Sequence, residues 1–387
     1  MDKDFWKNKT VLITGNTGFK GSWLTLMLKS LGARIVGYSL PPPTSPSLFE
    51  LAEIEKDMDM VCGDIRDKEH LAATFSQVRP QVVIHMAAQS LVRVSYNQPV
   101  ETCEVNIMGT VNVLEAVRTT QEVRAAVFVT SDKCYENKET KRSYTENDPM
   151  GGHDLYSCSK GCDELLISAY RRSFFAPKSL DQHQKAVASV RAGNVVGGGD
   201  WAQDRLVVDV LKALMANEQV VLRNPSAVRP WQHVLDPLSG YLLLAERLWE
   251  YGPEYASAWN FGPQQSDTRP VSWVADQLQN CWENGHSSSK VWKTLENENS
   301  LHEAGLLFLD AGKANRDLGW QPKLTIHESL AWTVTWYKAY HQGAKMKDTT
   351  MRQIENYRQL TCPDAHTESF HPLTPCLISS VPYSGNL

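Results

Sequence analysis

Residues 10–38 read TVLITGNTGFKGSWLTLMLKSLGARIVGY, and the order of residue types in this run dictates the architecture of the first half of the chain. A short apolar run leads into three glycines spaced three residues apart. Apolar residues at helical spacing follow, and then a second short apolar run. This order predicts strand, glycine turn, helix and strand, the unit in which a glycine turn binds phosphate. It therefore predicts an α/β protein with a Rossmann-type doubly wound parallel sheet and a dinucleotide on its glycine turn.

The glycine turn supplies the first candidates for contact with a cofactor. Glycines let the backbone approach a pyrophosphate closely, and the N-terminus of the following helix supplies amide hydrogens and a positive dipole. Residues 81–86 are nearly continuous apolar, as in a strand buried on both faces, and small residues end the run, leaving room for a ribose and nicotinamide. The candidates from both places are Gly15, Asn16, Thr17, Gly18, Phe19, Lys20, Gly21, Ala87, Ala88 and Gln89.

One feature departs from the usual dinucleotide pattern. The acidic residue expected about 20 residues beyond the first glycine, where it would hold the adenosine ribose, is missing. No Asp or Glu occurs between Gly21 and Glu50, and the second apolar run leads into three prolines at residues 41–43. Lys20 and Arg34 leave a 2′-phosphate, and hence NADP, open as an alternative. The missing carboxylate also leads to the hypothesis that the dinucleotide binds loosely.

A second group of reactive side chains surrounds residues 127–160. Ser131, Asp132 and Lys133 follow an apolar run at residues 125–129 that predicts a strand, and Tyr156 and Lys160 lie four apart on one face of a predicted helix. A phenol beside an ammonium group is easier to ionise, which suits a proton acceptor near neutral pH. Ser131 could hold a substrate oxygen on the other side. Taken alone, the Tyr–Lys spacing also fits an ordinary exposed pair.

Together these motifs resemble the extended short-chain dehydrogenase/reductase family, and within it the nucleotide-sugar 4,6-dehydratases. The resemblance covers roughly residues 5–355. Residues 14–21, 87–93, 131–133 and 191–201 are most similar to the branch that acts on CDP-glucose. It implies NAD, which such enzymes recycle within each turnover, and CDP-glucose as the small-molecule substrate. The product would feed deoxyhexose synthesis for cell-surface polysaccharide such as lipopolysaccharide O-antigen.

The resemblance also implies roles in the reaction. Tyr156, as phenolate near Lys160 and Ser131, would take the proton of the sugar 4-hydroxyl while hydride passes to NAD. The resulting ketone acidifies C5–H, water leaves C6 with Asp132 as the acid, and hydride returns, giving a 4-keto-6-deoxy sugar. The TDP-glucose branch has a glutamate base where this chain has Lys133. Catalysis of C5 deprotonation, stabilisation of an enolate and simple pairing with Asp132 stay open for this lysine.

Other binding candidates come from later motifs. Asn194, Arg205 and Arg229 are candidates for the substrate diphosphate, because an arginine fork matches phosphate geometry and an amide adds a neutral donor. Residues 229–234 resemble the family's phosphate-binding stretch, whereas Arg205 fits an ordinary surface charge equally well. Asp64 and Ile65 would contact adenine by resemblance, but a helix N-cap explains Asp64 as well.

The chain divides into three predicted parts. Residues 1–194, with interleaved later segments, form the NAD-binding domain, and residues 195–343 form a smaller C-terminal α/β lobe for the nucleotide sugar. Residues 344–387 form a poorly ordered tail with one polar helix over 345–360. By resemblance, the helices at 106–118 and around Tyr156 are the natural faces of a homodimer, and their apolar stripes could equally be internal core.

Composition excludes several other classes. The net charge of −5 provides no basic patch for nucleic acid, and no apolar run approaches the ~20 residues of a membrane helix. The polar residues 1–4 contain no signal-peptide core, and the eight scattered cysteines do not have the spacing of a zinc site. A cytoplasmic enzyme without a metal is predicted.

Two other functions fit part of the pattern. A nucleotide-sugar 4-epimerase or reductase shares Ser131, Tyr156 and Lys160 but has no use for an acid at Asp132. A non-enzymatic NAD(P)-sensing protein needs the glycine turn but not the Tyr–Lys pair.

Overall fold

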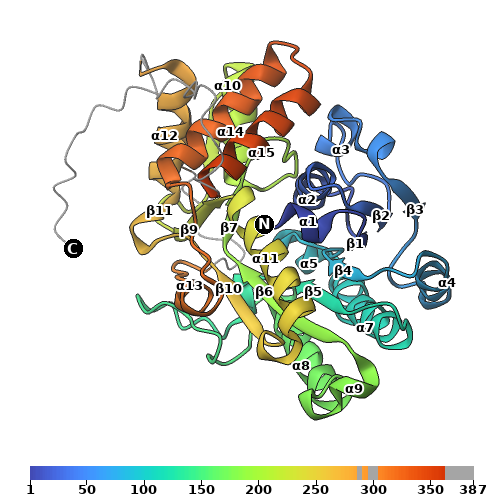
Figure 1. Cartoon of the computed structure of the whole chain (residues 1–387). Helices are drawn as coiled ribbons and strands as arrows, with labels where there is room; N and C mark the ends of the chain where they lie inside the picture. Colours follow the sequence, from blue (N-terminus) through green and yellow to red (C-terminus); the bar gives the residue numbers. More distant parts are fainter. Residues whose placement is uncertain (286–289, 295–303, 362–387) are drawn as a thin grey trace.

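A seven-stranded parallel sheet forms the centre of the computed structural model, which describes residues 1–285, 290–294 and 304–361 (Figure 1). The strands lie in the order β10-β6-β5-β4-β1-β2-β3. Their bounds are β1 (Thr10–Thr14), β2 (Arg34–Ser39), β3 (Asp59–Cys62), β4 (Val82–His85), β5 (Ala125–Val129), β6 (Ala186–Ala192) and β10 (Ala258–Phe261). Chain order runs one way from β1 to β3 and the other way from β4 onward, so a crevice forms between β1 and β4 at the carboxyl edge. The predicted fold class is confirmed.

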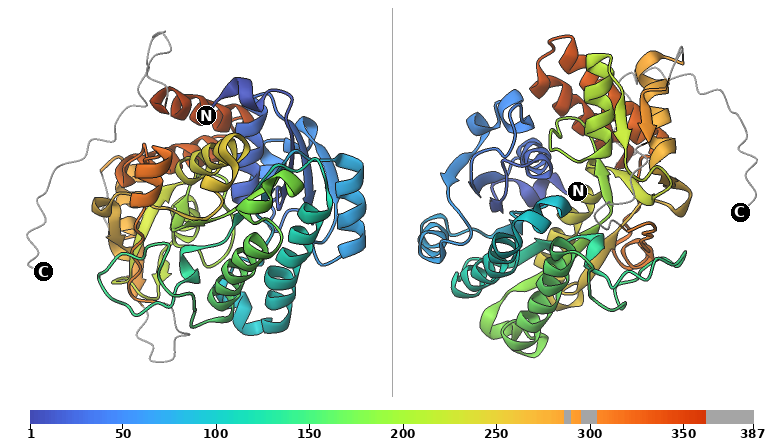
Figure 2. Two further views of the ribbon diagram at one scale, coloured as in Figure 1. Left: turned by 60° about the horizontal axis from the view of Figure 1, so that its bottom comes forward. Right: turned by 180° about the vertical axis from the view of Figure 1, so that it is seen from behind.

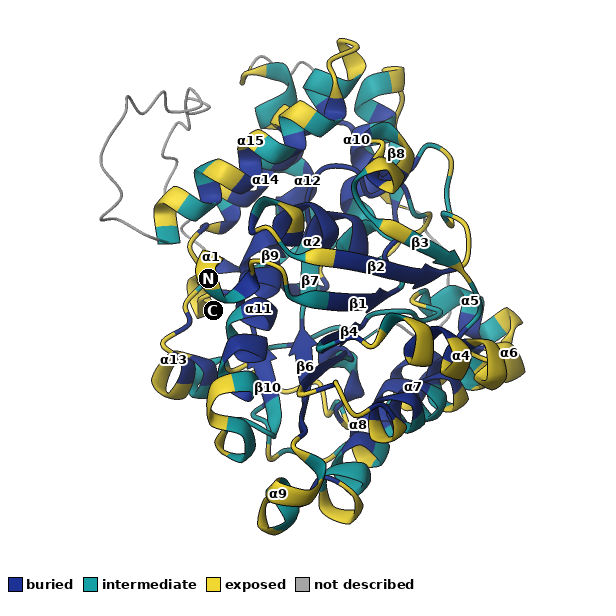
Figure 3. Cartoon of the chain, turned by 45° about the vertical axis from the view of Figure 1, so that its right-hand side comes forward, coloured by how far each residue is buried: buried dark blue, intermediate teal, exposed yellow. Residues whose placement is uncertain are grey.

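Successive side chains of the central strands enter two different hydrophobic cores. Val11, Val82 and Ala125 belong to the larger core, whereas their neighbours Leu12, Val83 and Ala126 belong to the smaller one. This period of two is that of a β-strand, and apolar residues on both sides of each strand mark a sheet that is covered on both faces. The inner strands are accordingly buried, whereas exposed residues lie mainly on the outer surfaces of the helices and in loops (Figure 3).

Helices cover the two faces of the sheet (Figure 2). Residues of α4 (Lys68–Val78), α7 (Gly109–Thr119) and α8 (Leu155–Ser173) build the smaller core, and residues of α2 (Phe19–Ser30) and α11 (Leu235–Tyr251) contribute to the larger one. Shorter helices are α1 (Lys3–Trp6), α3 (Leu48–Leu51), α5 (Val92–Asn97), α6 (Pro99–Cys103) and α9 (Leu180–His183). A π-helical turn, η2 (Glu104–Met108), joins α6 to α7.

The second lobe is smaller and shares its core with the first. Its sheets have the orders β11-β9-β7 and β12-β8, built from β7 (Asn194–Val196), β8 (Val220–Leu222), β9 (Val228–His233), β11 (Thr268–Pro270) and β12 (Trp292–Thr294). Its helices are α10 (Leu206–Ala216), α12 (Val271–Glu283) and α14 (Ile326–His341). The chain returns to the first sheet at β10, against which α13 (Gly312–Leu318) packs.

The end of the described chain differs from the predicted tail. The expected polar helix is present as α15 (Met346–Thr361), but it is docked on the protein, with Met346, Ile354 and Tyr357 buried. It packs against α14, α2 and α3, and Tyr357 donates a hydrogen bond to Asp236 Oδ1 at 2.8 Å. A poorly ordered tail from residue 344 is therefore wrong for α15. The rest of the predicted tail, residues 362–387, lies outside the described residues.

Within residues 1–285, 290–294 and 304–361, no helix combines the length and the apolar character needed to cross a membrane. In the same part of the chain, no three His, Cys, Asp or Glu side chains gather closely enough to hold a metal ion.

Candidate active site

A cavity of about 830 Å³ lies at the carboxyl ends of β1, β4 and β5 and extends into the second lobe. Its walls include the glycine turn, residues 86–94, residues 129–133 and the start of α8. The opposite wall comes from β7, β8 and the first turn of α10. Because this position is the crevice where ligands bind in doubly wound sheets, and because both lobes line it, the cavity can hold a cofactor and a second ligand together.

The glycine turn has the shape of a pyrophosphate cradle. Gly15 has φ of +77°, and a Cβ there would lie 2.6 Å from the amide nitrogen of Ala87. A Cβ on Gly21 would lie 2.2 Å from the carbonyl oxygen of Gly15, so only glycine permits α2 to pack this closely on the turn. At Gly18, the N-cap of α2, a Cβ would meet nothing closer than 3.5 Å, which leaves room for an approaching ligand. The first turn of α2 carries no acidic side chain, so its positive end is available to an anion.

The far end of the cavity, beside β2, is polar but carries no carboxylate on that strand. Ser39 donates to Asn16 Oδ1 at 2.8 Å, and Thr17 donates to the carbonyl oxygen of Leu40 at 3.0 Å. Arg34 is at the opposite end of β2, where it pairs with Asp59. Arg34, which left a 2′-phosphate open as an alternative, is thus remote from the end of the cavity where adenosine would bind.

Asp64 and Ile65 line the same end of the cavity. The Asp64 carboxylate accepts hydrogen bonds from the Arg66 guanidinium at 2.6 Å and from the Arg66 amide at 2.9 Å. The N-cap of α4 is Asp67, whose side chain accepts from the His70 amide. The N-cap interpretation of Asp64 is therefore wrong, and in this structure the carboxylate pairs with Arg66 at the edge of the cavity.

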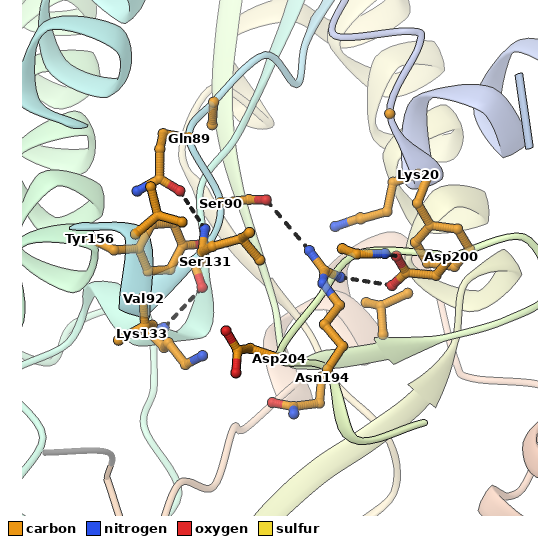
Figure 4. A pocket seen from close by; sticks show the side chains of 18 of the residues that line it. Lys20, Gln89, Ser90, Val92, Ser131, Lys133, Tyr156, Asn194, Asp200 and Asp204 are labelled. Carbon is orange, nitrogen blue, oxygen red and sulfur yellow. Dashed lines mark hydrogen bonds and ion pairs between the residues drawn. The ribbon is translucent and has the colours of Figure 1, made fainter. Parts of the chain in front are cut away.

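Lys20 lies at the other end of the turn from the adenosine region. Its Nζ donates to the Tyr241 hydroxyl at 3.3 Å. Lys20 and Asp200 lie on the same side of the cavity (Figure 4). Burial, together with the nearby Arg205, lowers the pKa of Lys20 to about 8. Lys20 therefore lies close to Tyr241 and Arg205, away from the end of the cavity beside β2.

Ser131 and Asp132 form a buried acidic centre at the end of β5. The Ser131 hydroxyl donates to Asp132 Oδ1 at 3.1 Å and accepts from the Lys133 amide at 3.2 Å, which caps the short 3₁₀ turn η3 (Asp132–Cys134). Asp132 is 3% exposed, and its Oδ2 has no hydrogen-bond partner among the described residues. Burial raises the pKa of Asp132, although Lys133 opposes the rise. The carboxyl group is consequently biased toward its protonated form, as a general acid requires.

Tyr156 and Lys160 enter the cavity from the first turns of α8. This helix is capped by Asp154, which accepts from the Ser157 amide at 2.9 Å, and the cap aims Tyr156 at the cavity. Tyr156 is 8% exposed and Lys160 3% exposed, so an ordinary exposed pair does not describe them. Ser131 and Lys133 lie on the same side of the cavity as the Tyr156 ring, and Lys133 Nζ is 6.0 Å from the ring centroid (Figure 4).

The three candidates for the diphosphate line the opposite wall. Arg205 bridges the lobes, because its guanidinium donates to Asp200 Oδ2 at 3.1 Å and to Ser90 Oγ at 3.4 Å (Figure 4). Arg229, on β9, is buried and donates to the carbonyl oxygens of Val228 at 2.9 Å and of Gly305 at 3.1 Å. Asn194, on β7, also lines this wall (Figure 4). Arg205 is therefore part of the cavity and more than a surface charge.

The backbone beside the cavity is held by Asn106. Its side chain accepts from the Gln89 amide at 2.8 Å and donates to the Gln89 carbonyl oxygen at 3.0 Å and to Ser159 Oγ at 2.8 Å. The π-helical turn η2 contains this asparagine, and such turns often occur at functional sites. These contacts fix the backbone at Gln89, which lines the cavity.

Sequence reasoning missed two residues of the site. Tyr241 is one, and no local pattern pairs it with Lys20. Asp163 is bonded to Lys160 Nζ at 2.9 Å, and the spacing of three residues on one helix was a signal that could have identified it.

Comparison with known proteins adds a family and a set of relatives. The family model described as GDP-mannose 4,6 dehydratase matches residues 12–333. The CDP-glucose 4,6-dehydratase of Salmonella typhimurium strain LT2 is 49% identical over 361 residues, which cover 93% of this chain and 99% of that protein.

Solved structures share the fold at lower identity. A dTDP-glucose 4,6-dehydratase from Bacillus anthracis, in complex with NAD, has a TM-score of 0.71 and 21% identity, covering 88% of this chain and 99% of that one. A UDP-glucose 4-epimerase from Thermotoga maritima, with UDP-glucose, has a TM-score of 0.72 and 22% identity, covering 86% and 99%. Since dehydratases and epimerases match equally well, the overall fold does not discriminate between them.

Proposed function

Because this chain belongs to the GDP-mannose 4,6-dehydratase family, we propose that it is a CDP-glucose 4,6-dehydratase, which converts CDP-D-glucose to CDP-4-keto-6-deoxy-D-glucose and water. The 49% identity to the Salmonella enzyme over nearly all of both chains supports this choice of nucleotide and sugar. The observation that carries the proposal is the buried, proton-biased Asp132 beside Ser131, in the same cavity as Tyr156. A 4-epimerase needs no acid there.

NAD fits the glycine turn, since Gly18 leaves room for the pyrophosphate at the start of α2. The residues that would hold it are the turn itself, Asp64 and Ile65 at the adenosine end, and the run from Ala87 to Gln89 beside β4. NAD supplies a temporary store for the hydride, which leaves C4 and returns to C6. The protein's own residues handle protons, orientation and the exclusion of water.

The first proton transfer falls to Tyr156. As phenolate, it accepts the proton of the sugar 4-hydroxyl and becomes the phenol, while the Ser131 hydroxyl holds the same substrate oxygen from the other side. Lys160 favours this transfer because a positive charge close to a phenol stabilises the phenolate. The burial of Tyr156 and Lys160 keeps water from competing for the proton.

Loss of water from C6 needs a proton for the departing hydroxyl, and Asp132 donates it. Its Oδ2 is buried without a partner among the described residues, which keeps that oxygen available to the substrate. Lys133 lies beside Asp132 and Tyr156 and takes part in removal of the C5 proton or in stabilising the enolate that results.

The substrate diphosphate would lie between the lobes. Arg205 and Arg229 provide guanidinium groups and Asn194 a neutral donor, all on the wall formed by the second lobe. We propose that residues 1–194, together with β10 and α13, form the cofactor domain and that the rest of residues 195–343 forms the sugar-nucleotide lobe. Helix α15 packs against α2, α3 and α14.

A homodimer is proposed for this protein. Met108, at the end of η2, is 53% exposed, and Leu165, on α8, is 60% exposed. These large apolar side chains are on the helices that were expected to form the dimer face, and burial of such side chains favours association. We further propose a cytoplasmic location and a role in deoxysugar synthesis for cell-surface polysaccharide, including O-antigen, with no nucleic-acid partner.

Incubation with CDP-, TDP-, GDP- and UDP-glucose tests the proposal. We expect a product one water lighter than its substrate from CDP-glucose, with one solvent deuterium at C5 when the reaction runs in deuterium oxide. The Tyr156→Phe variant is the control and should form no product. A product of unchanged mass with inverted C4 would identify an epimerase, and water loss from another nucleotide alone would overturn the choice of CDP.

A further inference from the structure

Lys160 and Asp163 form an ion pair that is almost completely withdrawn from solvent. The distance from Lys160 Nζ to Asp163 Oδ2 is 2.9 Å, and the side chains are 3% and 1% exposed. A buried lysine tends to lose its proton, because a low-dielectric surrounding disfavours the charged form. The Asp163 carboxylate therefore stabilises the charged form of Lys160 more strongly than it would on the protein surface, where ion pairs contribute little to stability.

The balance of forces on Lys160 is uneven. Burial would lower the pKa of Lys160, but Asp163, with support from Tyr156, raises it above its ordinary value. Burial also raises the pKa of Asp163 to about 6, although Lys160 opposes the rise. At pH 7 Asp163 is thus still mainly ionised, and the pair carries both charges.

The other groups that face Lys160 do not replace Asp163. Glu164, on the same helix, is occupied by Arg191 at 2.7 Å and by the Thr130 and Ser189 hydroxyls. His85, on β4, lies near Lys160, and burial lowers its pKa to about 3, so it is neutral. Lys20, on α2, carries the same sign of charge as Lys160.

A chain of hydrogen bonds leads from β1 toward Asp163. The Thr14 hydroxyl oxygen accepts from the amides of Met86 at 3.1 Å and Ala87 at 3.3 Å. A hydroxyl has two acceptor lone pairs and one proton, so the proton of Thr14 is left for His85 Nδ1, 2.7 Å away. This assigns the proton of the neutral imidazole to Nε2.

The chain then reaches α7. His85 Nε2 donates to the Thr110 hydroxyl oxygen at 3.1 Å, which leaves the proton of Thr110 for another acceptor. Asp163 is that acceptor, because the Thr110 hydroxyl lies close enough to lower the pKa of the carboxylate. Every donor in the chain consequently points toward Asp163, and such aligned bonds reinforce one another in a buried site.

We propose that Asp163 is a positioning residue that keeps the buried Lys160 protonated, and that Thr14, His85 and Thr110 hold the Asp163 carboxylate in place for this purpose. The inference deepens the proposed function, on which it rests for the role of Lys160 beside Tyr156. Without the carboxylate, Lys160 loses its proton at lower pH. Tyr156 then has no adjacent cation when it accepts the substrate proton.

The Asp163→Asn variant tests this without any turnover. Protein labelled with carbon-13 at lysine Cε is titrated by NMR, and the Lys160 signal is assigned by its loss in Lys160→Met. We expect the Lys160 midpoint to fall by about two pH units in Asp163→Asn, within the range known for buried lysines. The matched control is Asp181→Asn, which changes an exposed aspartate on α9 and should leave the midpoint unchanged. An unmoved midpoint in folded Asp163→Asn would overturn the inference.

Two further variants separate this role from packing. Asp163→Glu keeps the charge and should restore most of the Lys160 midpoint. If Asp163→Asn does not fold, Thr110→Val, which removes only a hydroxyl from the chain, should lower the midpoint in the same direction, by about half a unit; no change there would also refute the inference.

Activity measurements distinguish the inference from the proposed function. With CDP-glucose, Asp163→Asn should lose turnover toward alkaline pH, at a pH where the wild type is still active, with little change in KM. A shifted Lys160 midpoint in a protein that does not dehydrate CDP-glucose would support the inference and refute the function. If the protein dehydrates CDP-glucose but the Lys160 midpoint is unchanged in Asp163→Asn, the function is supported and the inference is refuted.

Discussion

Replacing Asp132 with asparagine should separate the two halves of the reaction. Asparagine has nearly the same shape, and its amide oxygen can accept the hydrogen bond that Ser131 now donates at 3.1 Å. The amide nitrogen takes the place of Oδ2, which has no partner among the described residues and is the oxygen available to carry the acidic proton. The variant therefore keeps the packing of a 3%-exposed site and removes only the acid.

The size of the effect follows from the role assigned to this proton. General acid catalysis contributes about 10²–10⁴-fold to a step, which corresponds to about 3–5 kcal/mol of activation free energy. Oxidation at C4 uses Tyr156 and does not use Asp132. We expect water loss to slow by that factor in Asp132→Asn while oxidation continues, so that reduced cofactor accumulates.

A single-turnover experiment measures both steps. Absorbance of the reduced nicotinamide follows oxidation, and mass spectrometry of the quenched sugar follows water loss. The wild-type rate of water loss should fall as pH rises and Asp132 loses its proton, whereas Asp132→Asn should lack this dependence. Water loss at the wild-type rate in Asp132→Asn, or no accumulation of reduced cofactor when turnover stops, would refute the assignment.

Four other outcomes are expected. Lys133→Ala should slow exchange of the C5 proton at least ~10-fold, as loss of a group that acts in proton transfer does, and full turnover would remove Lys133 from the mechanism. Freshly purified protein should need added NAD for full activity, because β2 carries no carboxylate for the ribose, and one tightly held NAD per chain would disprove this. Asp236, whose pKa burial raises from 3.8 to about 7, is stabilising in its protonated form. The stability that this proton contributes is fully present below the pKa of Asp236 in the unfolded chain and is lost as pH rises through about 7, by at most about 4 kcal/mol. Asp236→Asn should therefore make the melting temperature less dependent on pH between about 4 and 7. Leu165→Glu should shift the protein from dimer to monomer in light scattering, and an unchanged mass would exclude this face.

Local pattern was sufficient where a structural feature depends on neighbours in the chain. The strand, glycine turn and helix at residues 10–30 could be predicted because the hydrophobic periodicity and the glycine spacing that define them are local features of the sequence. The same holds for Tyr156 and Lys160, which share a helix face. Docking of α15 could not be predicted, because the helix is polar in composition and its buried residues depend on contacts with α2, α3 and α14.

Contacts between distant residues account for the rest of what sequence reasoning missed. Lys20 and Tyr241 are 221 positions apart, and their hydrogen bond exists only because α2 and α11 pack on the same face of the sheet. Arg205 was equally consistent with a surface charge until the fold brought it to Ser90 across the cavity. In both cases the side chain's chemistry was visible in the sequence, but its partner was set by tertiary packing.

Asp132 and Lys160 are both buried at the same cavity, but the shift of the pKa favours the neutral form of the first and the charged form of the second. Their immediate partners explain this difference. Burial favours the neutral form of every ionisable group, so Asp132 and Lys160 experience the same tendency. The Asp132 carboxyl group accepts a hydrogen bond from the neutral Ser131 hydroxyl, and burial raises its pKa although Lys133 opposes the rise. Lys160 touches the Asp163 carboxylate, and its charged form is favoured instead. A carboxyl group and a lysine, each with a raised pKa, thus coexist in the same buried site, and the Asp163 carboxylate in contact with Lys160 explains why burial does not lower the pKa of the lysine.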